Sequence, residues 1–173
     1  QIFRQMLDSS RISGKIDTLF YIVNNMNICK ALIKSEAERI ELSDLNRSAA
    51  DKARKSAAFS SAVSYYETAR DLLTEQEWVK RQDILFYMSI DLTTCTLLSG
   101  DIVKAGTLCD QVSLLARTPI EKAIVSNIRM LIFEFQGKMV EAIEEIRATL
   151  RSFNIELPST QQEIGMAMQT GIG

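Results

Sequence analysis

A helix–turn–helix junction is encoded by the seven residues Ser99-Gly100-Asp101-Ile102-Val103-Lys104-Ala105, which recur 37 residues later as Gln136-Gly137-Lys138-Met139-Val140-Glu141-Ala142. An earlier version reads Ser56-Ala57-Ala58-Phe59-Ser60-Ser61-Ala62. The shared pattern is a small residue, an apolar residue two positions later and Ala three positions after that. The small residue permits a tight turn after a helix, and the Ala lets the two helices approach closely. The pattern therefore predicts helical hairpins.

Helix-start signals occur at similar intervals and support this prediction. Each is a Ser or Thr followed three residues later by Glu, which is the sequence of a capping box. In the third signal, Pro occupies the first helical position, where its missing N–H group costs nothing. The four signals are Ser35-Glu36-Ala37-Glu38, Thr74-Glu75-Gln76-Glu77, Thr118-Pro119-Ile120-Glu121 and Thr160-Gln161-Gln162-Glu163.

Together these signals predict an all-α protein of stacked antiparallel helical hairpins. We expect residues 1–34 to form two helical pieces that adjoin a preceding domain. Residues 35–157 then hold three hairpins, at about 35–73, 74–117 and 118–157, the second of which begins with one long helix from Thr74 to about Ser99. Residues 158–173 should begin a further, truncated helix. No segment shows a strand pattern of convincing length.

The composition restricts the classes of function. The chain has 173 residues and a formal net charge of −2, which gives no electrostatic reason to bind nucleic acid or an acidic membrane. It has no His, so the commonest general base and metal ligand are missing. We expect no catalytic residue, no metal, no cofactor and no membrane span. The spacing of the three cysteines matches no metal motif, and we expect them to be buried and reduced in a cytoplasmic protein.

The aromatic side chains allow two interpretations, core packing or a partner-binding box. Phe59 and Tyr66 follow the apolar face of their helix and are expected in the core. Tyr65 lies off that face and is the better candidate for an exposed contact. Trp78, in the first turn of its helix, is expected to pack against the preceding hairpin.

The junction pattern resembles the tetratricopeptide repeat, in which a small residue at the turn precedes an apolar residue and an Ala. Gly100, Ile102 and Ala105 match this pattern, whereas the family's bulky residue early in the first helix falls on Asn46, Ser89 and Ser126. The resemblance implies a right-handed solenoid whose first helices line a concave groove. The implied groove positions are Asp44, Arg47, Asp51, Arg54, Tyr87, Ile90, Thr94, Leu97, Ile124, Asn127, Leu131 and Glu134. They change from charged to largely apolar, which suggests that another element covers the later groove, unless these residues simply pack between helices.

Longer stretches are similar to the helical-repeat region of large signalling ATPases of the AAA/STAND type. These proteins combine a serine/threonine-kinase-like domain, the ATPase, the repeats, a GAF domain and often a sensor histidine kinase. The resemblance is carried by residues 19–27, 45–59, 62–69, 97–100 and 150–158. It implies a non-catalytic protein-interaction and coupling module of a two-component signal-transduction protein. Its partner would be an adjacent domain of the same chain or another signalling protein. A ligand-responsive arm of a STAND-type transcription regulator and a purely structural spacer are the alternatives, and the oligomeric state stays open.

Overall fold

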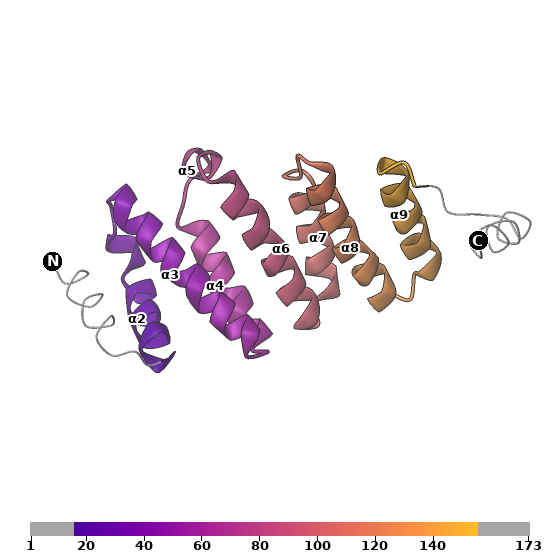
Figure 1. The fold of residues 1–173 in the computed structure, drawn as a ribbon. Coiled ribbons are helices and arrows are strands. Elements are labelled where there is room, and N and C mark those ends of the chain that lie inside the picture. Colours follow the sequence, from indigo (N-terminus) through magenta and orange to yellow (C-terminus); the bar gives the residue numbers. More distant parts are fainter. Residues whose placement is uncertain (1–15, 156–173) are drawn as a thin grey trace, which may run out of the picture. The chain divides into compact units, whose positions relative to one another are not determined.

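The computed structural model describes residues 16–155, and this part of the chain is helical, without strands. The chain divides after Leu115 into two units, which are described separately. The first unit contains α2 (Ile16–Ile28), a short 3-10 turn η1 (Lys30–Leu32), α3 (Glu36–Lys55), α4 (Phe59–Asp71), α5 (Glu75–Val79), α6 (Gln82–Leu98) and α7 (Ile102–Ser113). The second contains α8 (Pro119–Phe135) and α9 (Met139–Ser152) (Figure 1). The first helical piece expected before residue 16 and the helix expected from Thr160 lie outside the described residues.

The three predicted junctions are confirmed as tight turns between consecutive helices. Ala57, Gly100 and Gly137 have φ values of 56°, 96° and 73°, in the left-handed region. In each turn the next amide bonds back to the carbonyl five residues earlier, for example Asp101 N to Thr96 O at 3.2 Å. This arrangement satisfies carbonyls that the helix end would leave free. The repeated Ala residues, Ala62, Ala105 and Ala142, are all buried, as the close approach of the helices requires.

Two of the expected capping boxes are present and one is not. The Thr74 and Thr118 side chains accept from the amides of Glu77 and Glu121, and both Glu side chains bond back to the cap amide. Ser35 begins α3 but makes no side-chain cap hydrogen bond, so that prediction is wrong. The three cap residues are all exposed, but their N3 residues differ: Glu77 and Glu121 are buried, whereas Glu38 is only half-buried, so water can satisfy the first amides of α3.

The single long helix expected from Thr74 to Ser99 is wrong, because the structure has α5 and α6 with a break at Lys80 and Arg81. α5 is held by its own contacts: Trp78 is buried and its ring N–H donates to the carbonyl of Arg70, at 3.1 Å. The expected packing of Trp78 on the preceding hairpin is therefore confirmed. The backbone of Arg81 is not helical, with φ −130° and ψ 33°, and this residue is the N-cap of α6.

The core of the first unit is formed by the inward faces of α3, α4 and α6. α3 packs against α4, α4 against α6 and α6 against α7. Tyr66, Leu92 and Cys95 are fully or almost fully buried in this core. Phe59 is partly buried against it, so the placement of Phe59 and Tyr66 in the apolar core is confirmed.

Two single-residue expectations are wrong. Tyr65 is not a free exposed contact, because its ring stacks on Phe20 of α2, with centroids 5.8 Å apart, and its hydroxyl donates to Asn24 at 2.8 Å. None of the three cysteines forms a disulfide, and Cys95 and Cys109 are buried as expected, but Cys29 is exposed. Cys29 lies between α2 and η1, since it directly follows the last residue of α2.

Candidate functional site

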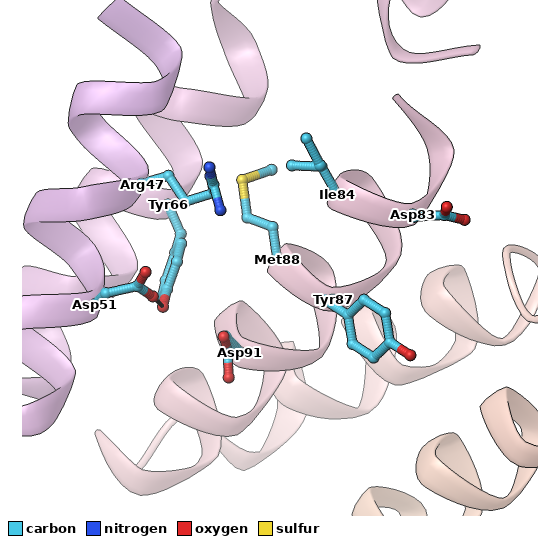
Figure 2. A pocket seen from close by; sticks show the side chains of 8 residues that line it. All are labelled: Arg47, Asp51, Tyr66, Asp83, Ile84, Tyr87, Met88 and Asp91. Atoms are coloured by element: carbon cyan, nitrogen blue, oxygen red, sulfur yellow. Dashed lines mark hydrogen bonds between the residues drawn. The ribbon is translucent and has the colours of Figure 1, made fainter. Parts of the chain in front are cut away.

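A cavity of about 220 Å³ lies in the first unit, where side chains of α3, α4 and α6 meet at the edge of the core. Figure 2 shows its walls: α3 and α4 supply one side, and Ile84 and Met88 of α6 extend toward Arg47 from the other. Asp83 and Tyr87 lie on the side of α6 that faces away from α3 (Figure 2). The lining residues are Arg47, Asp51, Tyr66, Asp83, Ile84, Tyr87, Met88 and Asp91.

Helical periodicity places these side chains. Arg47 and Asp51 are one turn apart on α3, and Ile84, Met88 and Asp91 follow each other at four and three residues on α6. Each set therefore forms one stripe, and the two stripes face each other across the cavity. Tyr66 reaches the same cavity from α4, which packs against both helices.

Ion pairs join α3 to α6 and to the residue before it. Arg81 donates to both carboxylate oxygens of Asp44, at 2.7 and 2.9 Å, and Arg47 of the cavity lining lies 3.5 Å from the same carboxylate. Arg54 lies 3.7 Å from Asp91, which also lines the cavity. Long side chains thus bridge two helices that leave a hollow between them.

The hydrogen-bond partner of Asp51 is a neutral hydroxyl group. The Tyr66 hydroxyl donates to one carboxylate oxygen of Asp51, at 2.5 Å. Burial and this hydrogen bond raise the pKa of Tyr66 above its ordinary value, so it remains a neutral donor. Asp51 lines the cavity, and its charge also interacts with the Arg54 guanidinium, one turn farther along α3.

Asp91 is the second carboxylate at the cavity floor. Burial raises its pKa above the ordinary range of Asp, and the nearby Arg54 guanidinium partly offsets this effect. A carboxylate that has lost water without gaining a close hydrogen-bonding cation is stabilised by any further positive charge that reaches it.

The structure brings part of the expected groove together. Arg47, Asp51 and Tyr87 line the cavity, and Asp44 and Arg54 form ion pairs with the lining residues Arg47 and Asp91. Ile90 and Thr94 are half-buried on α6 and do not line it, and Leu97 is buried. In the second unit, Asn127 and Glu134 are exposed, whereas Ile124 and Leu131 are half-buried.

Sequence reasoning missed Arg81, Met88, Asp91 and the polar role of Tyr66. Asp91 lies four residues after Tyr87, on the same side of the helix, so its spacing was an available signal. The partnership of Tyr66 with Asp51 had no such signal, because the apolar periodicity of α4 identifies Tyr66 only as a core residue.

Other types of site are not supported by the described residues. Within residues 16–155 no group of three His, Cys, Asp or Glu could hold a metal ion. In the same part of the chain no helix combines the length and the apolar character that crossing a membrane would demand. Comparisons with protein-family models, with curated proteins and with solved structures find no match to this chain.

Proposed function

We propose that this chain is a non-catalytic protein-interaction module made of tetratricopeptide-like hairpins that stack as a right-handed solenoid. The repeated junction supports this proposal, because the same positive φ and the same buried Ala occur in hairpins α3/α4, α6/α7 and α8/α9. Stacked hairpins commonly use the surface of their first helices for binding.

The observation that carries the proposal is the open cavity between α3 and α6, the first helices of two consecutive hairpins. It is lined by charged and aromatic side chains, and Tyr87 at its edge is 53% exposed. Exposed aromatic residues beside charged groups are common in protein interfaces.

The proposal extends to a biological setting by resemblance to signalling ATPases and sensor histidine kinases. In such a cytoplasmic protein, binding of a partner to the module would alter the neighbouring domains, because the curvature of a hairpin stack responds to contacts along its length. Cys95 and Cys109 form no disulfide, which suits a reducing compartment. Partners would be such a domain or a separate signalling protein.

A random-peptide display selection against the immobilised full chain tests the binding function. We expect enriched peptides whose capture is reduced by Tyr87→Ala and unchanged by Tyr21→Ala, because Tyr21 is an exposed tyrosine outside the cavity. If no peptide is enriched above an unrelated helical protein, the binding function is wrong and a structural spacer becomes the better description.

A further inference from the structure

The side of α9 next to its contact with α8 carries a stripe of apolar side chains. Within residues 16–155, α9 packs against α8 through the side that holds Ala142, which is buried, and Thr149, whose hydroxyl hydrogen-bonds to that of Ser126. Five apolar residues follow each other beside this contact at spacings of four and three, which place them on one face. The apolar stripe consists of Met139, Ile143, Ile146, Leu150 and Phe153, all exposed except the half-buried Leu150.

The equivalent positions of the first hairpin are covered. Counted from the turn residues Ala57 and Gly137, the equivalents of Met139, Ile143, Ile146 and Phe153 are Phe59, Val63, Tyr66 and Leu73. Tyr66 and Leu73 are 0% and 7% exposed, and Phe59 and Val63 are partly buried against the same core. In contrast, Ile146 and Phe153 are 37% and 39% exposed. The same apolar register is therefore buried in one hairpin and open in the other.

In the first unit, the hairpin that follows provides the cover. Met88 and Leu92 of α6 belong to the same apolar cluster as Tyr66 and Leu73, and α6 packs against α4. The segment that leads into α6 begins with the capping box at Thr74. An apolar stripe in this register thus receives the helix that begins shortly after it.

We propose that residues 160–173 of this chain form a helix that packs on the apolar stripe of α9. These residues lie outside the described part of the chain, and their sequence supports the proposal. Thr160-Gln161-Gln162-Glu163 repeats the type of signal that begins α8 at Thr118. Counted from these two Thr residues, Ala167 and Met168 take the positions of Val125 and Ser126, which are both buried. Ile164 lies one turn before Met168 and extends the same apolar face.

The length of this segment and its connection suit the arrangement. α9 has 14 residues, and residues 160–173 are equally many, so a helix of this length would span α9 from end to end. Residues 153–159 join the two segments and easily cross the roughly 8–10 Å between packed helices. A short connection favours antiparallel neighbours, so the segment would begin near Ser152 and run toward Met139.

A tethered segment is a better occupant of the stripe than a second copy of the chain. Through a short linker its effective concentration is on the order of millimolar, which a separate copy in dilute solution does not reach. The inference concerns α9 and not the cavity, so it does not depend on the proposed binding function.

Paramagnetic relaxation enhancement in the full chain tests the contact. Cys29→Ser removes the exposed thiol, and Gln169→Cys then provides one site for a nitroxide label, because Cys95 and Cys109 are buried. Position 169 corresponds to the exposed Asn127 of α8, so the label would point away from α9. We expect the label to broaden the amide signals of Val140 and Ile143 strongly. A segment that merely follows the end of α9 would broaden Phe153 and its neighbours and leave these two signals sharp, which would overturn the proposal.

Variants of the labelled segment show whether its apolar face makes the contact. Met168→Ser should reduce the broadening of Val140 and Ile143, whereas Gln162→Ser should leave it unchanged, since position 162 corresponds to the exposed Ile120 of α8. Equal broadening in both variants would contradict the proposed packing.

A mixture of isotope-labelled chain without nitroxide and unlabelled chain with nitroxide reports contacts between copies. We expect no broadening of α9 signals in this mixture. Broadening there as strong as within one chain would mean that a second copy occupies the stripe, and it would overturn the proposal.

Discussion

Asn46 of α3 and Asn27 of α2 exchange two amide hydrogen bonds, at 2.8 and 2.9 Å. Asn46 is completely buried, and its amide nitrogen also donates to the carbonyl of Leu42, at 2.9 Å. The amide pair joins α2 to α3 and satisfies a polar group that would otherwise be costly to bury.

Asn46→Ala should lower the free energy of unfolding by about 2–3 kcal/mol, since it removes buried hydrogen bonds and leaves a cavity. Asn127→Ala, at an exposed position of α8, is the matched control and should change stability by less than about 0.5 kcal/mol. Urea denaturation followed by circular dichroism measures both. The double variant Asn27→Ala/Asn46→Ala should lose less stability than the sum of the two single losses, because both residues belong to the same hydrogen-bonded pair. Equal losses of stability for Asn46→Ala and Asn127→Ala would contradict a stabilising role of this pair.

Ala57→Gly should stabilise the chain. Ala57 has φ 56°, and an L-residue in this region costs roughly 1–2 kcal/mol, whereas Gly loses roughly 0.5–1 kcal/mol in added chain entropy. The difference predicts a net gain of about 0.5–1 kcal/mol in the free energy of unfolding. Gly100→Ala is the reverse control and should lose a similar amount through strain alone, since a Cβ there meets no heavy atom within 4 Å. A destabilised Ala57→Gly variant would refute this reasoning.

The hairpins were predictable because their signals are local. Gly100 and Gly137 supply the backbone freedom of the turn, and Ala62, Ala105 and Ala142 supply the close contact, within a few residues of one another. The break before α6 was not predictable, because it depends on where Trp78 finds its hydrogen-bond partner on the preceding hairpin.

The candidate site, too, was predictable from the sequence only in part. Arg47 and Asp51 could be placed on one face of a helix from spacing alone. Two contacts, the hydrogen bond from Tyr66 to Asp51 and the one from Arg81 to Asp44, depend on how α4 and α6 pack beside α3. Helical periodicity does not contain this information. Tyr65 was wrongly expected to be exposed, because the pattern of α4 alone does not show that α2 packs against the Tyr65 side of this helix.

Thr118→Ala and Ser35→Ala should differ in cost although the two residues occupy equivalent sequence signals. The Thr118 hydroxyl accepts from the amide of Glu121 at 3.1 Å, whereas Ser35 makes no cap hydrogen bond. Loss of an N-cap typically costs about 1 kcal/mol, so Thr118→Ala should lose about that amount and Ser35→Ala less than about 0.5 kcal/mol. Urea denaturation decides between this result and equal losses, which would mean that Ser35 does cap α3 in solution.

Acid should destabilise the chain through the buried capping carboxylates. Hydrogen bonds from the amides of Thr74 and of Thr118 and Arg117 lower the pKa of Glu77 and Glu121. A carboxylate whose pKa is lower in the folded state contributes stability that is complete above its unfolded pKa of about 4.3. That contribution is lost as the pH falls below this value and through the folded pKa.

Unfolding in urea at several pH values between about 7 and 3 measures this dependence. Glu77→Gln should flatten the acid limb, because Gln keeps a side-chain oxygen for the cap amide but no longer titrates. Glu75→Gln, at an exposed neighbour in α5, should leave the limb unchanged. Identical acid limbs for the two variants would show that Glu77 is not responsible.

The three thiols should differ in reactivity. Cys29 is exposed, whereas Cys95 and Cys109 are buried, and burial raises the pKa of Cys95 to about 11. Because the thiolate is the reactive form, at pH about 8 one thiol should react quickly with Ellman's reagent and the other two only in urea. Cys29→Ser should abolish the fast phase and leave the slow one. A second fast thiol in the native chain would contradict the packing of α6 against α4 and α7, since Cys95 lies in that core.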